Sequence, residues 1–160
     1  MATKNAKAKW REFPQSWALI VRRYLPCLAL CSLLWELAQL PLYAIWAEAG
    51  PARIAYSVVH CTAGDVLIGV TALLIALSIA HAGDPANWPV TRIGVLTVLL
   101  AVVYTSVSER LNLYRGSWAY SPWMPVLPWL HVGLAPVMQW VLVPAAAVWW
   151  ATRQRRNPFR

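Results

Sequence analysis

The sequence predicts an all-α fold, an integral membrane four-helix bundle with both termini cytoplasmic. Three observations predict it. Of the 160 residues, 59% are apolar and only 12% are charged, whereas an ordinary soluble domain has about 25% charged residues. Four apolar stretches are long enough to cross a bilayer, and most basic residues lie near the two ends of the chain. The composition excludes a disordered chain, a collagen-like chain and an ordinary soluble enzyme.

The four spans follow from length and composition. A transmembrane helix needs about 20 mainly apolar residues, each rising about 1.5 Å. The stretches that meet this requirement are 24–46, 54–81, 90–108 with a polar continuation to 113, and 128–152. No cleavage site follows the basic N-terminal segment, so we expect the first span to be retained. The predicted organisation is a basic lead-in with an interfacial helix over 1–23, a four-span domain over 24–152, and a basic tail over 153–160.

The charge distribution predicts the orientation. Of the 14 Lys and Arg residues, eleven lie on the side that holds both ends of the chain, and three, Arg53, Arg110 and Arg115, lie on the other. The positive-inside rule then places the ends in the cytoplasm and the first and third loops in the periplasm of a bacterial inner (plasma) membrane. The basic residues form no continuous face, which argues against a nucleic acid and makes the lipid bilayer the expected partner.

Three carboxyl groups are the predicted catalytic residues, namely Glu36, Asp65 and Glu109. A charged side chain at the bilayer centre costs roughly 2.5–3.5 kcal/mol, so such residues normally face the bundle interior. The rise per residue places Glu36 and Asp65 about 15 Å from the ends of their spans, near the midplane, and Glu109 above them. Because no Lys or Arg lies at that depth, we expect one of the two deeper acids to hold a proton. The sequence therefore predicts a polar pocket in the periplasmic half of the bundle.

Further polar residues share these helix faces or belong to the third loop. Gln39 and Tyr43 follow Glu36 at helical spacing, and Asn112 follows Glu109 in the same way. The third loop is aromatic and rich in proline, which is typical of a lid over the bundle or of an interfacial aromatic belt. The predicted substrate-binding residues are Gln39, Tyr43, His60, Asn112, Trp118, Tyr120 and Gln139.

Other interpretations of the same residues stay open. Buried polar side chains also join membrane helices, at about 0.6 kcal/mol per hydrogen bond. His60 and His131, placed on the second and fourth spans, could hold a b-type haem between facing helices, and a quinone or a divalent metal are further ligands of that kind. No cofactor is required by the sequence. Gly64 and Gly69 are expected to be packing residues of the second span.

One stretch resembles a known family. The residues concerned are Glu109, Asn112, Gly116, Trp118, Tyr120, Pro125, Gly133 and Pro136. Their pattern resembles the small membrane carotenoid cyclases and hydratases over roughly forty residues around the third loop. Those proteins have a carboxylate, a Gly-x-aromatic-x-Tyr turn and then a span with Pro and Trp. The resemblance implies an isoprenoid substrate that is protonated at a double bond.

Three classes of function remain after this reasoning. The first is an intramembrane enzyme that uses acid–base chemistry on a lipophilic, isoprenoid-like substrate. The second is a structural or accessory subunit, or a small transporter with a proton relay, either of which implies a membrane-protein partner or a homo-oligomer. The third is a haem- or quinone-binding subunit. The sequence leaves open whether the protein is an enzyme, but it holds no phosphate-loop, Ser-His-Asp or zinc-protease motif.

Overall fold

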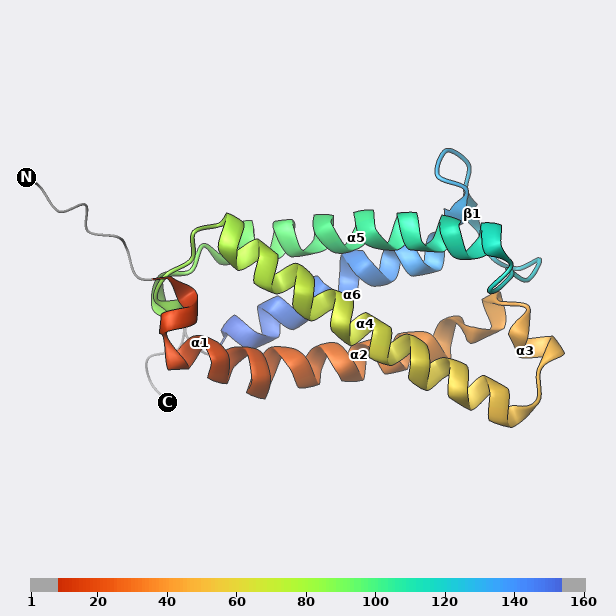
Figure 1. Ribbon diagram of the computed structural model, residues 1–160, viewed down its shortest axis with the longest axis horizontal. Coiled ribbons are helices and arrows are strands. Elements are labelled where there is room, and N and C mark those ends of the chain that lie inside the picture. The colour runs from red at the N-terminus through yellow and green to blue at the C-terminus, as the bar shows by residue number, and fades with distance from the viewer. Residues whose placement is uncertain (1–8, 154–160) are drawn as a thin grey trace, which may run out of the picture.

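The computed structural model describes residues 9–153 and shows a bundle of four long helices (Figure 1). The helices long and apolar enough to cross a membrane are Pro14–Leu42, Pro51–Ile79, Val90–Arg115 and Leu134–Arg153. This confirms the all-α class and the four predicted spans of a multi-pass membrane protein. The end of the bundle with Pro14 and Arg153 is called the terminal end, and the opposite one the cavity end. Residues 1–8 of the predicted lead-in and 154–160 of the predicted basic tail lie outside the described residues.

The first span begins earlier than predicted. A short helix η1 (Trp10–Glu12) is followed by α1 (Pro14–Leu19), a π-helical turn η2 (Ile20–Tyr24), α2 (Leu25–Gln39) and η3 (Leu40–Leu42). The lead-in is therefore continuous with the span instead of forming a separate interfacial helix. Pro14 allows this because a proline in the first helical turn removes no hydrogen bond. At the other end Tyr43 is extended and α3 (Ile45–Glu48) follows.

The next two spans have clear start and stop residues. Helix α4 (Pro51–Ile79) has proline at its first position, and α5 (Val90–Arg115) follows a short η4 (Pro85–Asn87). Gly116 ends α5 with φ of 67°, a left-handed conformation that suits glycine. The amide of Ser117 donates to the Asn112 carbonyl at 3.0 Å, which completes the cap.

The fourth span is shorter than predicted. Helix α6 covers Leu134–Arg153, whereas residues 128–133, expected to be helical, belong to a hairpin. Its strands are β1 (Val126–Leu127) and β2 (Val132–Gly133), paired antiparallel with Val126 opposite Gly133. His131 has φ of 54° in the turn between them, which is incompatible with a continuing right-handed helix. The hairpin projects from the cavity end in Figure 1.

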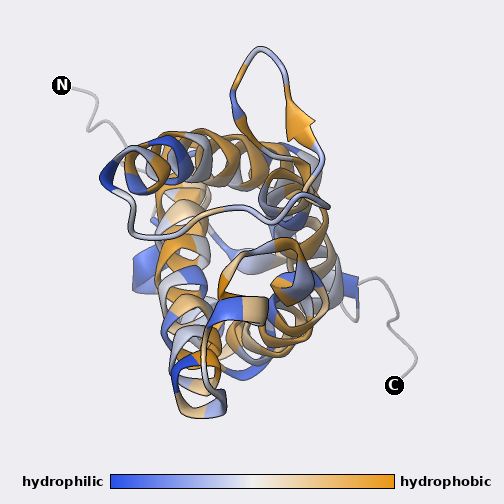
Figure 2. Cartoon of the chain, turned by 90° about the vertical axis from the view of Figure 1, so that its right-hand side faces the viewer, coloured by the Kyte–Doolittle hydropathy of each residue, from blue (hydrophilic) through white to orange (hydrophobic). Residues whose placement is uncertain are grey.

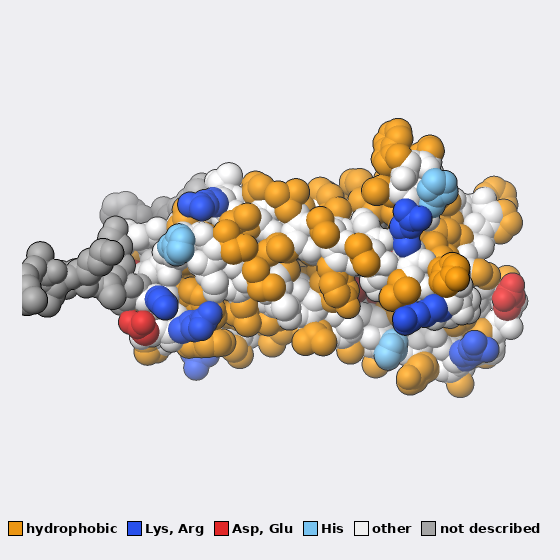
Figure 3. Space-filling model, turned by 45° about the horizontal axis from the view of Figure 1, so that its top comes forward, with side chains coloured by type: hydrophobic (Ala, Val, Ile, Leu, Met, Phe, Trp, Pro, Cys, Tyr) orange, Lys and Arg blue, Asp and Glu red, His pale blue; other side chains and the backbone are white. Residues whose placement is uncertain are grey.

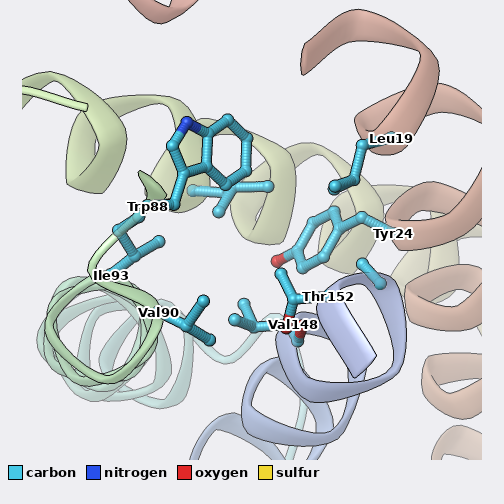
Figure 4. A pocket seen from close by; sticks show the side chains of 9 residues that line it. Leu19, Tyr24, Trp88, Val90, Ile93, Val148 and Thr152 are labelled. Atoms are coloured by element: carbon cyan, nitrogen blue, oxygen red, sulfur yellow. Dashed lines mark hydrogen bonds between the residues drawn. The ribbon is translucent and has the colours of Figure 1, made fainter. Parts of the chain in front are cut away.

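The core is concentrated at the terminal end. Helix α2 packs against α4 and α6, and α5 packs against the same two helices. Tyr24, Leu28, Ala76, Leu77 and Ala147 are fully buried there. A void of only about 10 Å³ remains between Tyr24, Ile93, Val148 and their neighbours (Figure 4), which is hardly space for one water molecule.

The outer surface agrees with a membrane environment. Many Leu and Val side chains of the spans are exposed, such as Leu67 at 70% and Val103 at 64%. Figure 3 shows these apolar side chains over the middle of the face it presents, with the charged residues at the two ends. An apolar middle between polar ends is what a bilayer-spanning bundle requires.

Candidate functional site

A large cavity occupies the cavity end of the bundle. Its volume is about 870 Å³, and residues of α2, α3, α4, α5, α6 and the loop after α5 line it. Figure 2 views the molecule from this end, with the loops in front of the bundle. A volume near the upper limit for small-molecule pockets can accept a drug-sized ligand. All three predicted catalytic carboxyl groups, Glu36, Asp65 and Glu109, lie on its wall.

Glu36 and Asp65 form a pair across two spans. Glu36 is on α2 and Asp65 on α4, both line the cavity, and the hydrogen bonds of Gln39 and Gln139 link the two side chains. Two carboxyl groups placed together on a cavity wall can act as an acid and a base in turn.

Two glutamines hold this pair in place. The Gln39 amide nitrogen donates to Glu36 Oε1 at 2.8 Å, and the Gln139 amide nitrogen donates to Asp65 Oδ2 at 2.6 Å. The Gln39 nitrogen also reaches the Gln139 carbonyl oxygen at 3.4 Å, and Trp35 Nε1 donates to Gln39 Oε1 at 3.2 Å. The network thus joins α2, α4 and α6, and each acid accepts a neutral donor in place of a cation.

Glu109 has different surroundings. Its Oε1 accepts the Tyr43 hydroxyl at 3.2 Å, and its Oε2 accepts the Tyr120 hydroxyl at 2.5 Å and Trp118 Nε1 at 3.4 Å. Both oxygens are therefore occupied by aromatic donors. Burial, together with the neighbouring Glu109 carboxyl, raises the pKa of Tyr43 and Tyr120 above the usual tyrosine value. Both phenols consequently stay neutral and act as donors.

These contacts tie the third loop to the end of the first span. Tyr43 and Tyr120 form an isolated β-bridge, with Ala44 donating to the Ala119 carbonyl and Ser121 to the Leu42 carbonyl, both at 2.9 Å. The Tyr120 hydroxyl also accepts the Gly133 amide at 2.8 Å, which adds the hairpin. The loop thus crosses one side of the cavity, and Trp118 lies on the cavity wall.

The other predicted binding residues have mixed positions. Gln39, Tyr43, His60, Asn112 and Gln139 line the cavity, whereas Tyr120 contacts it only through Glu109. The Asn112 amide nitrogen donates to the Ser108 carbonyl of its own helix at 2.9 Å. His60 is exposed and stacks on Tyr56 with ring centroids 5.7 Å apart.

The haem alternative rested on an incorrect position for His131. That residue lies in the exposed turn of the hairpin, outside the fourth span, and does not line the cavity as His60 does. The two histidines are therefore not on facing helices. Within residues 9–153 there is also no group of three or more His, Cys, Asp or Glu side chains that could hold a metal ion.

Tyr56, Cys61, Tyr104 and Trp140 line the cavity and were not anticipated. Thr105 shares the predicted helix face of Glu109 and Asn112, and it lines the cavity with a hydroxyl that has no hydrogen-bond partner among the described residues. Thr105 precedes Glu109 by four residues, so the helical spacing was a usable signal. The prediction for Gly64 was wrong, since a Cβ atom there would meet no described atom within 4 Å. Gly69 does pack closely, because its Cβ would lie 2.7 Å from Leu28 Cδ2.

No protein-family model, curated protein or solved structure matches the chain.

Proposed function

We propose that this membrane protein is an enzyme that transfers protons to and from a lipophilic substrate held in the cavity. The observation that carries the proposal is the Glu36–Asp65 pair, linked by Gln39 and Gln139 on the wall of a large cavity within the span region. A carboxyl group that retains its proton in an apolar surrounding is a suitable general acid, and its partner is a suitable base.

The resemblance to the carotenoid cyclases and hydratases supplies a substrate class, a long isoprenoid chain. The pair's proton would form a C–H bond with the electron pair of a substrate double bond, leaving a carbocation. Loss of a neighbouring proton to the pair, or addition of water followed by loss of a proton, would restore the starting state. Aromatic rings on the wall, such as Tyr104 and Trp140, stabilise a cation through their π faces.

In this proposal Glu109 has a positioning role. Because its two oxygens already accept three aromatic donors, it is less available as a base than Glu36 or Asp65. It holds Tyr43, Trp118 and Tyr120, and so fixes the loop at the cavity.

A transmembrane proton relay has less support. Such a relay needs polar groups from one end of the bundle to the other. In the described residues the terminal end is instead packed with side chains such as Leu28, Leu73 and Leu77, and its void is about 10 Å³. The cavity is thus closed toward that end, which suits a binding site better than a pathway.

The test uses heavy water and needs no identified substrate. Purified protein is incubated in deuterated buffer with a bacterial lipid extract, and mass spectrometry follows deuterium entering stable C–H bonds of a lipid. We expect labelling by the unmodified protein. Glu36→Gln and Asp65→Asn should lower its rate by about 10²–10⁴-fold, the usual contribution of general acid–base catalysis.

Glu12→Gln is the matched control, because Glu12 is an exposed carboxyl at the terminal end. It should leave the labelling rate unchanged. The proposal fails if no lipid is labelled, or if both cavity variants label lipids as fast as the unmodified protein.

The orientation is part of the proposal. Six basic residues of the described chain lie near the terminal end, namely Lys9, Arg11, Arg22, Arg23, Arg92 and Arg153, against Arg53, Arg110 and Arg115 near the other. The positive-inside rule therefore favours a cytoplasmic terminal end and a periplasmic cavity. Reporter fusions at Pro51 and Trp123 should read periplasmic and a fusion at Pro85 cytoplasmic; the opposite readings would reverse the orientation.

A further inference from the structure

We infer that the cavity is reached sideways from the bilayer, through an opening between α4 and α5, and that it holds the polar end of a single-chain lipid. The inference deepens the proposed function by naming the substrate class and its route, and it rests on that proposal only for the chemistry performed.

The two helices separate toward the cavity end. Figure 1 shows α4 crossing the bundle diagonally, beside α5 near the terminal end and beneath it, near α2 and α3, at the other. Two glycines of α4 show where its close packing ends. At Gly69 the helix is in close contact with Leu28 of α2, whereas at Gly64, five residues nearer the cavity end, there is free space. The close packing of α4 against α2 therefore ends between these residues, where the cavity begins.

Side chains that both line the cavity and face outward identify the opening. Tyr56 of α4 is 68% exposed and Tyr104 of α5 is 55% exposed, and both belong to the cavity wall. Tyr104 precedes the end of α5 at Arg115 by eleven residues, so it lies about 16 Å from that end. This depth is within the hydrocarbon layer of a bilayer that is about 30 Å thick. The opening thus borders the acyl chains of the bilayer as well as the water at the cavity end.

The chemistry of the opening suits a hydrocarbon chain. At the depth of Tyr104 the wall residues Cys61, Gly64 and Ile68 of α4 carry no charge, and Asp65 on the same stretch is only 8% exposed and bonded to Gln139. Apart from the three carboxyl groups of the site, the charged wall residues are Glu48 of α3 and Arg53 at the start of α4, both near the loops. A lipid chain can cross the uncharged part without losing a hydration shell, whereas a charged soluble ligand cannot.

A second, independent observation indicates a polar group at the inner end of the ligand. Thr105 is only 7% exposed and lines the cavity, and its hydroxyl has no hydrogen-bond partner among the described residues. A buried hydroxyl without a partner is costly, and a hydroxyl or carbonyl oxygen of a ligand would remove that cost. The ligand is therefore an alcohol or carbonyl lipid whose chain extends through the opening into the bilayer.

Photo-crosslinking tests the route. The full-length protein in phospholipid vesicles is irradiated with a long-chain alcohol that carries a diazirine close to its hydroxyl group, and adducts are mapped by mass spectrometry. We expect adducts on the peptides that contain Glu36, Asp65 and Thr105, besides adducts on exposed outer residues such as Leu99 and Val103. A short sulfonated diazirine, which stays in water, should not label the cavity peptides.

Two variants make the result specific. Gly64→Phe fills the free space beside the opening and should remove most of the cavity adducts while leaving the outer ones. Ala63→Phe places the same ring on the exposed neighbouring position, outside the cavity wall, and should change neither. Thermal unfolding of both variants verifies that they fold.

The outcomes separate this inference from the proposed function. Three results would each overturn the lateral route. In the first, only the sulfonated probe forms cavity adducts; in the second, neither probe forms any; in the third, the alcohol probe forms as many in Gly64→Phe as in the unmodified protein. A different result would keep the lipid site but refute the proposed enzymatic function. In that case Gly64→Phe removes the cavity adducts, while Glu36→Gln and Asp65→Asn leave the rate of deuterium labelling unchanged.

Discussion

The two ends of this bundle are built from the same four helices but differ in how they are held together. At the terminal end, apolar side chains meet directly and leave a void of about 10 Å³. At the cavity end the helices enclose about 870 Å³ and are joined by polar contacts, through the Gln39–Gln139 network and Glu109. Close packing provides stability at one end, and directional hydrogen bonds keep a cavity open at the other.

Matched Leu→Ala substitutions should show the largest difference between the ends. Leu77 is fully buried at the terminal end, whereas Leu113 is a half-buried residue on the cavity wall. We expect Leu77→Ala to lower the free energy of unfolding by about 2–5 kcal/mol, because it leaves a new cavity in a packed region. Leu113→Ala only enlarges an existing one and should cost much less. Equal losses of thermal stability in detergent would contradict the comparison.

The two glycines of α4 provide a smaller and sharper contrast. In Gly69→Val the added carbon atoms would press on Leu28, at a cost of about 1–3 kcal/mol for overpacking. Gly64→Val meets open space and should be nearly neutral, or slightly stabilising because a glycine within a helix is replaced. Thermal unfolding of the two variants side by side measures the difference, and a greater loss for Gly64→Val would contradict the close packing at Gly69 and the free space at Gly64.

The most local expected effect is at the loop. Glu109→Gln replaces one carboxylate oxygen, an acceptor, by an amide that donates toward the Tyr or Trp donors it faces. We expect a loss of about 1–3 kcal/mol that is confined to the loop contacts. Hydrogen exchange should become faster at the amides of Ala44 and Ser121, which bridge the loop and the first span, while Ala76 and Leu77 stay protected. Faster exchange throughout the chain would instead mean that Glu109 supports the whole bundle.

Much of the fold could be predicted because the four spans are determined by local composition. The limits of the spans were less predictable. An apolar run such as Pro128-Trp129-Leu130 suits a helix as well as a hairpin, and the hairpin is decided by contacts with distant residues, such as the Gly133 amide with the Tyr120 hydroxyl. The first span was predicted too short because Arg22 and Arg23 suggested a boundary, although helices at a membrane surface tolerate such residues.

For the site, helical spacing indicated which polar residues share a face. Depth along the spans placed Glu36 and Asp65 at one level, and in the structure Gln39 and Gln139 link them on one cavity wall. Spacing does not indicate pairs between segments, however. The contact between Gln39 and Gln139 links positions 100 residues apart, and that between Tyr43 and Glu109 links positions 66 apart. These pairs depend on how the helices rotate and cross, which a single sequence does not reveal.

The π-helical turn η2 (Ile20–Tyr24) has a consequence for how this chain can vary in length. Such a turn holds one residue more than an α-helical turn, and the extra residue is accommodated without rotating the segments on either side. Removing one residue there would convert it to an ordinary turn and leave both flanking faces in their present directions. Elsewhere in the first span, a deletion would rotate Glu36 and Gln39 by about 100° relative to the residues before them. Homologues that differ by one residue in the first span are therefore expected to carry the gap at this turn.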